Sequence, residues 1–338
     1  MIVEMTTGSS REEVDKVVER ARLMGLKVQL NVGAERTVVA VLGSNTGALP
    51  TDTFAVLPGV ENVTRIMKPY KLASRDFKPG GSVVNINGVE VGSGRIVVMA
   101  GPCAVENEEQ MLAIAGVVKD SGASVLRGGA FKPRTSPFNF QGLEEEGLKL
   151  LAKAREKCDI PVVTEVVDPH DVEMVARYTD ILQVGSRNMQ NFALLSSVGR
   201  SRRPVLLKRG FACTVTEWLT AADYILAEGN SGVILCERGI RTFEDSTRFS
   251  LDVSSIPVIK HYSHLPVIVD PSHAAGNYSL VPAMAKASLA AGADGLLIEV
   301  HPNPKEALVD GPQSLTPSDF ARLMKELDSL SRSVGRYM

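Results

Sequence analysis

The 338-residue sequence lacks a large excess of charge of either sign. Lys and Arg number 37 and Asp and Glu number 39, which gives a formal net charge of −2. Proteins whose main partner is nucleic acid or an anionic membrane tend to be strongly basic, so this balance argues against both partners. The sequence also lacks an apolar run long enough to span a bilayer, and we expect neither a membrane segment nor a signal peptide.

Cysteine is scarce. The four cysteines lie far apart and form no Cys-x-x-Cys pair. This spacing excludes a dense disulfide framework and favours a protein of the reducing cytoplasm. We expect Cys158, Cys213 and Cys236 to be small buried hydrophobic residues, whereas Cys103 has a second interpretation that is given below.

The first 68 residues predict a small α+β domain. Apolar and β-branched segments at 2–5, 28–32, 37–42 and 60–67 predict strands. A helical pattern follows Ser9 and Ser10 and stops at Gly25, and a short helix is expected over 52–57. This β-α-β-β-α-β order is typical of a ferredoxin-like domain. Residues 69–94 then predict a linker followed by a β-hairpin with Asn87-Gly88 as its turn.

From residue 95 to 338, apolar runs alternate with helical segments. The predicted strands are 95–103, 124–130, 161–167, 180–187, 204–210, 232–239, 266–273 and 295–302. Near-continuous apolar strands with helices between them indicate a parallel sheet covered by helices, and the count of eight favours a closed (β/α)8 TIM barrel. An open doubly wound sheet is the alternative, but no Gly-x-Gly-x-x-Gly turn follows an early strand.

Basic side chains gather at the C-terminal ends of the predicted strands, where barrels of this kind build their active sites. They are Arg127, Arg187, Lys208, Arg209 and Arg238, together with Lys132 and Arg134 in the loop after the second strand. A single arginine at such a place is more often part of a structural ion pair, but Glu165 and Glu237 are too few to neutralise this set. We therefore expect phosphate and carboxylate ligands, which arginine grips in bidentate fashion.

A second group of strand-end residues has metal-ligand chemistry. Cys103, His273 and Glu299 end the first, seventh and eighth strands, which are neighbours in a closed barrel, and Asp310 follows in the next loop. A thiolate, an imidazole and two carboxylates favour a divalent transition ion. Each residue alone has a plainer interpretation as a buried or solvated side chain, and His301 is a competing ligand.

Lys208 has a rival interpretation. A lysine near the end of an internal barrel strand is where Schiff-base aldolases keep their nucleophile. Arg209 follows it directly in a cation-rich region, which fits anion binding at least as well.

Several motifs are similar to those of one enzyme family. They are GPCAVE (101–106), LRGGAFKPRTSPFNFQG (126–142), QVGSRNMQNF (183–192), LLKRG (206–210), ILCERGIRTFE (234–244), VDPSHAAG (269–276), EVHPNP (299–304) and DGPQSL (310–315). Together they resemble the 3-deoxy-D-arabino-heptulosonate-7-phosphate (DAHP) synthases over nearly the whole chain, and most closely the subfamily with an N-terminal ferredoxin-like regulatory domain. The KPRTS element distinguishes them from the sister 3-deoxy-octulosonate-8-phosphate synthases, which typically have an Asn-Arg-Ser-Ser type of loop.

The resemblance implies a transferase that condenses phosphoenolpyruvate (PEP) with erythrose 4-phosphate and water, the first step of the shikimate route to aromatic amino acids. It implies a divalent metal (Mn, Fe, Co or Zn) whose ligands are Cys103, His273, Glu299 and Asp310. PEP would be held by Arg127, Lys132, Arg187, Lys208 and Arg238, and the sugar phosphate by Arg134, Thr135 and Ser136. Catalytic roles would fall on Lys132, Lys208, Glu165, His273 and Cys103, with Glu165, Lys208 or a metal-bound water handling the protons.

The same resemblance implies feedback inhibition by tyrosine or phenylalanine bound to residues 1–68, and assembly into a homotetramer. One departure is Asn277-Tyr278, where the family often has two basic residues after VDPSHAAG. It puts in doubt any contact of that loop with the second phosphate or a neighbouring subunit. The alternatives are the octulosonate activity, an N-terminal domain that serves only assembly, and a non-catalytic sensor built on a decayed barrel.

Overall fold

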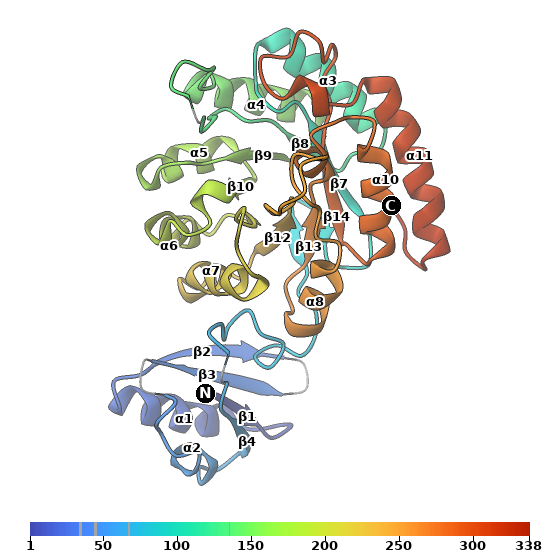
Figure 1. Ribbon diagram of the computed structural model, residues 1–338. Coiled ribbons are helices and arrows are strands. Elements are labelled where there is room, and N and C mark those ends of the chain that lie inside the picture. Colours follow the sequence, from blue (N-terminus) through green and yellow to red (C-terminus); the bar gives the residue numbers. More distant parts are fainter. Residues whose placement is uncertain (34–35, 44–45, 67, 135) are drawn as a thin grey trace. The chain divides into compact units, whose positions relative to one another are not determined.

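The structure is a computed structural model that describes residues 1–33, 36–43, 46–66, 68–134 and 136–338 (Figure 1). The chain forms two compact units. One comprises Met1–Gly81 with Tyr262–His264, and the other comprises Ser82–His261 with Leu265–Met338.

The smaller unit holds an antiparallel sheet with two helices. Its elements are β1 (Ile2–Met5), α1 (Arg11–Leu23), β2 (Lys27–Val32), β3 (Thr37–Leu42), α2 (Asp52–Ala55) and β4 (Val60–Thr64). The strand order is β2-β3-β1-β4, which is the order that a ferredoxin-like chain produces. The predicted last strand is shorter than expected, and Met67, at its predicted end, lies outside the described residues.

Helix α1 shows why this unit folds as the sequence predicts. It begins at a capping box in which the Ser10 side chain accepts a hydrogen bond from the Glu13 amide and the Glu13 carboxylate accepts one from the Ser10 amide. Residues at helical spacing then bury one face of the helix, namely Val14, Val17, Val18 and Ala21. This stripe packs with Val39 and Val41 of β3 and Phe54 of α2.

The segment after β4 is packed rather than extended into solvent. Tyr70, Leu72 and Phe77 are buried. The Leu72 carbonyl is 2.7 Å from Nε2 of His264, which lies in a loop but is itself buried. Burial lowers the pKa of His264 to about 4, so its ring is neutral at physiological pH.

The larger unit contains a closed barrel of eight parallel strands. These are β7 (Val97–Gly101), β8 (Val125–Arg127), β9 (Val162–Glu165), β10 (Ile181–Val184), β11 (Val205–Lys208), β12 (Val233–Glu237), β13 (Val267–Val269) and β14 (Gly295–Glu299). The ring closes where β14 pairs with β7, from Gly295 beside Val97 to Glu299 beside Gly101. The predicted TIM barrel is confirmed, and the open doubly wound alternative is wrong.

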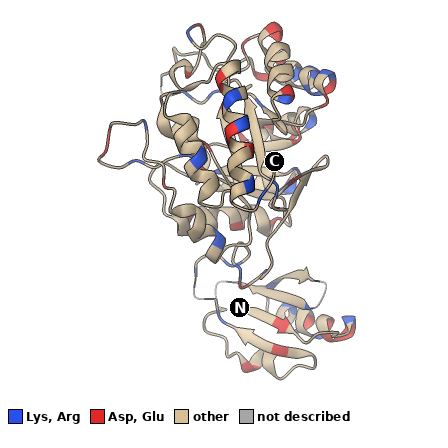
Figure 2. Ribbon diagram, turned by 90° about the vertical axis from the view of Figure 1, so that its right-hand side faces the viewer, with Lys and Arg blue, Asp and Glu red and all other residues tan. Residues whose placement is uncertain are grey.

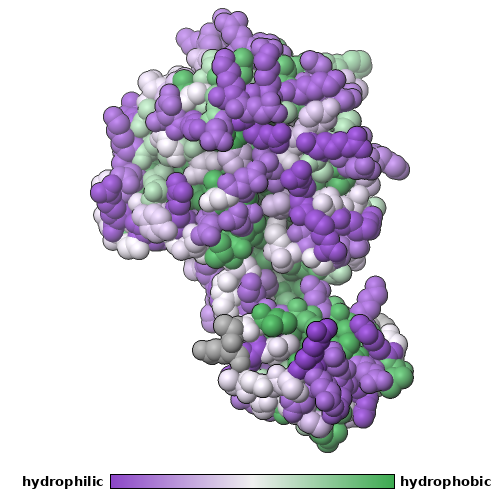
Figure 3. Space-filling view, turned by 180° about the vertical axis from the view of Figure 1, so that it is seen from behind, coloured by the Kyte–Doolittle hydropathy of each residue, from purple (hydrophilic) through white to green (hydrophobic). Residues whose placement is uncertain are grey.

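Helices surround this barrel in Figure 1. They are α3 (Glu108–Asp120), α4 (Glu144–Cys158), α5 (Val172–Tyr178), α6 (Phe192–Arg200), α7 (Val215–Ala227), α8 (Ser255–Tyr262), α10 (Val281–Ala290) and α11 (Pro317–Ser333), with the short α9 (Pro271–Ala275) after β13. Figure 2 shows acidic and basic residues interspersed on the helices that face the viewer, as expected for surfaces in contact with water. The face seen in Figure 3 is largely hydrophilic.

A hairpin packs against the core of the barrel. Strands β5 (Val84–Ile86) and β6 (Val89–Val91) pair antiparallel through the turn at Asn87 and Gly88, both of which have positive φ. Val84, Ile86 and Val91 join the cluster formed by inward residues near the strand starts, such as Val97 and Ile181. The hairpin therefore adds to the core at the end of the barrel opposite the C-terminal strand ends.

Within the part of the chain that the structure describes, we find no helix with the length and apolar character needed to cross a bilayer.

Candidate active site

A cavity of about 390 Å³ lies among side chains from the C-terminal ends of the barrel strands and the loops that follow them. Its basic lining residues are Lys132, Arg134, Arg187, Arg238, Arg241 and Arg248. Among the described lining residues only Glu165 and Asp310 are acidic. The excess of positive charge makes the cavity suited to anionic ligands.

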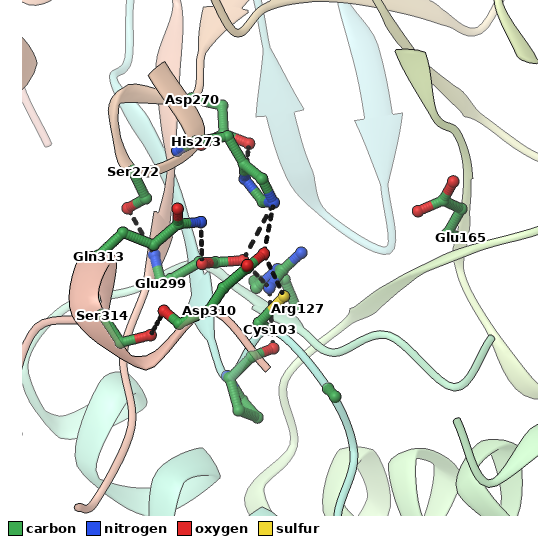
Figure 4. Close-up of polar contacts among 12 residues, drawn as sticks. Cys103, Arg127, Glu165, Asp270, Ser272, His273, Glu299, Asp310, Gln313 and Ser314 are labelled. Carbon is green, nitrogen blue, oxygen red and sulfur yellow. Dashed lines mark hydrogen bonds and ion pairs between the residues drawn. The ribbon is translucent and has the colours of Figure 1, made fainter. Parts of the chain in front are cut away.

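Four side chains with metal-ligand chemistry meet beside this cavity, and Figure 4 shows them pointing toward one another. Ligand atoms of Cys103, His273, Glu299 and Asp310 all lie within 4.8 Å of one another. Cys103 Sγ is 3.4 Å from Asp310 Oδ2. His273 Nε2 is 3.4 Å from Glu299 Oε1 and 3.7 Å from Asp310 Oδ2.

These separations fit a bound transition ion. Four nitrogen, oxygen and sulfur donors at tetrahedral positions around such an ion lie roughly 3.3–3.7 Å apart. The three distances given above fall in this range, and the donor set is the mixed one that such ions accept. The four residues therefore form a candidate metal centre, as their positions in the sequence predict.

Backbone geometry explains how two of these ligands are placed. Gly101 has φ of 153°, and a side-chain carbon there would lie 2.1 Å from the Arg127 carbonyl oxygen. Only glycine therefore fits at the turn that leads to Cys103. Asp310 has φ of 55°, in the left-handed region that residues other than glycine seldom adopt. Strain of this kind is often found at functional sites.

Asp270 orients the histidine ligand. It is the N-cap of α9, and its Oδ1 accepts a hydrogen bond from the His273 amide at 2.9 Å. Its Oδ2 lies 2.7 Å from His273 Nδ1. A hydrogen bond from Nδ1–H to this carboxylate leaves the lone pair of Nε2 facing the other three ligands.

The charges around the cluster set its protonation state. Burial, reinforced by Glu299, raises the pKa of Cys103 to about 12, against the opposing effect of Lys132. Burial opposes ionisation of Asp310, but His273 and Arg248 lower its pKa to about 2. At neutral pH the protein's own charges thus favour a neutral thiol beside ionised carboxylates. Ligation by the thiolate needs the positive charge of a bound cation.

Two stacked phenylalanines in the cavity lining support the arginines. The rings of Phe211 and Phe249 are 5.1 Å apart and nearly parallel. The Arg238 guanidinium lies 4.1 Å from the Phe249 ring centre and 4.9 Å from that of Phe211. Arg187 and Arg241 also lie over Phe211, at 5.4 and 5.5 Å. These contacts orient the guanidinium groups without neutralising them.

Arg238 is the clearest sign of an anion site. It is 4 % exposed, and its buried Nη1 has no hydrogen-bond partner among the described residues. Burial lowers the pKa of its guanidinium to about 10. A buried guanidinium nitrogen without a partner is unfavourable unless a ligand supplies the acceptor.

Two predicted anion-binding residues are engaged in ion pairs outside the cavity lining. Arg127 Nη1 is 2.9 Å from Glu299 Oε1, and Lys208 Nζ is 2.6 Å from Asp270 Oδ2. Both pairs are buried. Neither Arg127 nor Lys208 is therefore among the described residues that line the cavity.

The loop that contains KPRTS is only partly described. Lys132 and Arg134 line the cavity, and Lys132 Nζ lies 3.0 Å from Cys103 Sγ. Ser136 is not among the lining residues, and its Oγ accepts a hydrogen bond from the Phe138 amide at 3.4 Å. Thr135 lies outside the described residues.

Glu165 and His301 are placed clearly. Glu165 lines the cavity, accepts a hydrogen bond from Gln183 at 3.2 Å and lies well away from the metal cluster in Figure 4. His301 Nε2 is 3.4 Å from Glu106 Oε2, and its Nδ1 accepts a hydrogen bond from the Asn303 amide. His301 is therefore not one of the four clustered ligands.

Sequence reasoning missed several residues of this site. It assigned no role to Asp270, although the spacing of three residues to His273 was a usable signal for a helix cap. Arg241 lies within the motif ILCERGIRTFE (234–244), but nothing in the sequence indicates that it faces the cavity. Arg248 comes from the irregular stretch between β12 and α8, where no periodic pattern places it.

Comparison with known proteins decides the family. The model of the DAHP synthetase I family matches residues 76–333, and that of the DAHP synthase ferredoxin-like domain matches residues 1–68. The chain belongs to the DAHP synthase family. Its predicted membership, including the subfamily with a ferredoxin-like domain, is confirmed, and the members are transferases.

Individual relatives agree. A phospho-2-dehydro-3-deoxyheptonate aldolase of Thermotoga maritima is 47% identical, with 99% of each chain covered. Its crystal structure superposes with a TM-score of 0.79, covering 99% of this chain and 98% of that one. A 2-dehydro-3-deoxyphosphooctonate aldolase of Francisella tularensis is 32% identical and covers 74% of this chain and 98% of its own. The sequence identity to the Thermotoga maritima enzyme is thus higher than that to the Francisella tularensis enzyme, and it extends over the N-terminal domain.

Proposed function

We propose that this member of the family condenses PEP with erythrose 4-phosphate and water to give DAHP and inorganic phosphate, the first step of the shikimate pathway for aromatic amino acid biosynthesis. The observation that carries the proposal is the juxtaposition of the four-ligand cluster with a cavity lined by six basic side chains. Two phosphorylated substrates repel each other in water, and such a cavity brings them together.

We propose that PEP binds on the Phe211–Phe249 side of the cavity. Arg187 and Arg238 supply planar donors for its phosphate or carboxylate there. Lys132 also lines the cavity, 3.0 Å from Cys103 Sγ, and its amine offers a further donor. Contact of PEP with Arg127 or Lys208 requires these residues to share or exchange their ion pairs with Glu299 and Asp270.

The sugar phosphate is assigned to the loop of KPRTS. Arg134 lines the cavity and carries the charge, and Thr135 and Ser136 would add hydroxyl donors. In this proposal the aldehyde of erythrose 4-phosphate lies between PEP and the metal cluster.

The proposed metal ligands are Cys103, His273, Glu299 and Asp310. A bound Mn, Fe, Co or Zn ion would act as a Lewis acid on the aldehyde oxygen. The protein holds Glu299 against Arg127, and His273 against Asp270, so that both side chains are oriented before substrate arrives.

Water must add at C2 of PEP, and this step needs a group that accepts a proton. Among Glu165, Lys208 and a metal-bound water, we assign it to Glu165, because its carboxylate lines the cavity and has one oxygen held by Gln183. Lys208 is buried in an ion pair with Asp270, which also disfavours it as a Schiff-base nucleophile.

Substrate preference tests the proposed reaction. We expect kcat/KM with erythrose 4-phosphate to exceed that with arabinose 5-phosphate by at least about tenfold, because discrimination by one or two contacts is of this order. Phosphate release from PEP with each sugar in turn is the measurement. A preference for the pentose would favour the octulosonate activity, and no release with either would favour a non-catalytic sensor.

We also propose that residues 1–68 form a regulatory domain that binds tyrosine or phenylalanine, and that residues 95–338 form the catalytic barrel. The enzyme is proposed to act as a homotetramer in the cytoplasm, where its free cysteines stay reduced.

The Asn277-Tyr278 loop is exposed, with the Tyr278 amide bonded to the Pro312 carbonyl.

Deletion of residues 1–68 tests the regulation. The truncated chain should keep turnover and lose inhibition by both amino acids, because the barrel has its own closed sheet and core. The structure of a truncated form of the Thermotoga maritima enzyme is known. Its superposition on this chain has a TM-score of 0.75 and covers 80% of this chain and 99% of the truncated one. The measurement is the initial rate with and without about 1 mM tyrosine or phenylalanine. This is roughly the upper range of metabolite concentrations. Inhibition that survives the deletion would place the effector elsewhere.

A further inference from the structure

Each carboxylate of the metal cluster presents one oxygen to the other ligands and holds its second oxygen in a contact outside the cluster. Asp310 Oδ2 faces Cys103 and His273, whereas its Oδ1 is 3.2 Å from Arg248 Nη1. Glu299 Oε1 faces His273 and also lies 2.9 Å from Arg127 Nη1, whereas its Oε2 accepts a hydrogen bond of 2.6 Å from Gln313 Nε2.

Arg248 and Gln313 are joined to each other. Arg248 Nη1 donates to Gln313 Oε1 at 2.8 Å. A guanidinium can only donate hydrogen bonds, so the atom of the Gln313 amide that faces Arg248 must be the oxygen. The nitrogen Nε2 is then left to donate to Glu299. Gln313 is 2 % exposed, so the orientation of its amide is not averaged by water.

The backbone around Arg248 is bound to the helix that carries the histidine ligand. The Arg248 and Phe249 amides donate to the carbonyls of Ala275 and Ala274, at the end of α9. The Arg248–Gln313 pair therefore contacts all three elements that carry His273, Glu299 and Asp310. These elements are α9, β14 and the loop after β14.

We propose that Gln313 and Arg248 are positioning residues for the metal ligands. By holding the outer oxygens, they keep Glu299 and Asp310 as ligands through one oxygen each. This inference rests on the proposed metal centre. Loss of such outer contacts typically weakens metal binding by about 10–100-fold, because the freed carboxylate rotates away or binds through both oxygens.

Arg248 allows this role to be separated from general stability. Its side chain is 38 % exposed, and ion pairs at such exposure contribute little to folding. Replacing it should therefore leave the metal-free protein folded while it changes metal affinity. Arg241 provides a matched control, because it is another cavity arginine whose guanidinium lies over Phe211.

The test is titration of the metal-stripped full-length protein with Co²⁺, followed by the thiolate-to-cobalt absorption band and the visible ligand-field bands. We expect Gln313→Met and Arg248→Met each to raise the Co²⁺ dissociation constant by at least about tenfold and to change the ligand-field spectrum. In the double variant, the increase in the Co²⁺ dissociation constant should be much smaller than the product of the two single increases, since the two residues act through one contact. Arg248→Lys should recover part of the affinity by keeping the charge near Asp310.

The outcomes separate this inference from the function on which it rests. If the parent protein gives no thiolate-to-cobalt band, the metal centre and the positioning role both fail. If the parent gives the band, but Gln313→Met and Arg248→Met bind Co²⁺ within about twofold of it or Arg241→Met is equally affected, the positioning role alone is overturned. Thermal unfolding of each metal-free variant confirms folding, and the Arg248 variants decide the matter if Gln313→Met does not fold.

Discussion

Replacing Cys103 by alanine is expected to lower kcat/KM by about 10³-fold or more. The thiol is buried against Asp310 and Lys132 and is the sulfur ligand of the proposed centre. Lewis-acid stabilisation by a metal amounts to several kcal/mol, and each 1.36 kcal/mol is a factor of ten in rate. Phosphate release from PEP and erythrose 4-phosphate measures the rate, and the metal content per chain after gel filtration measures the site itself.

Cys158→Ala is the matched control. Cys158 ends α4, is partly exposed and takes no part in the metal cluster. Its replacement should leave both rate and metal content close to those of the parent. If Cys103→Ala also kept the parent's rate and metal content, the four-residue metal centre would be wrong.

Cys103 also illustrates what the sequence could predict. Ligands at the ends of the first, seventh and eighth strands can be grouped from sequence, because closure of an eight-stranded barrel makes those strands neighbours. The pairing of β7 with β14 and of β14 with β13 provides this closure. Strand lengths were predicted less well. The run 124–130 gives only Val125–Arg127 as a strand, although Gly129 still forms an isolated parallel bridge with Ala104.

The direction in which strand-end cations point could not be predicted. Arg127 and Lys208 look like Arg187 and Arg238 in sequence, since all four follow apolar runs. Two of them are paired with carboxylates 172 and 62 residues away, and no local pattern reveals such partners. Arg248 gave no signal at all, because the stretch that carries it has no periodicity. Long-range ion pairs and irregular loops are what a pattern of apolar residues leaves undetermined.

Replacing Arg238 by methionine should lower activity and raise stability together. Loss of a buried charged donor to the substrate costs about 2–5 kcal/mol, so KM for PEP should rise by about 30-fold or more. Because burial lowers the pKa of this guanidinium to about 10, folding disfavours its charged form. The folded state is thus destabilised at every pH below about 10, and the substrate-free variant should gain about 1–2 kcal/mol at pH 7. Initial rates against PEP concentration and urea unfolding measure the two effects.

Arg209→Met is the matched control for the stability change. Arg209 is also 4 % exposed, but it pairs with Glu237 at 2.9 Å and Asp252 at 2.7 Å. Its removal leaves the buried Glu237 carboxylate without the cation that it pairs with and should destabilise the protein by about 3–5 kcal/mol. PEP should protect the parent against unfolding far more than it protects Arg238→Met, because only a ligand that binds the folded state stabilises it. If Arg238→Met instead lost stability as Arg209→Met does and kept its KM for PEP, Arg238 would be a structural residue and the anion site would have to lie elsewhere in the cavity.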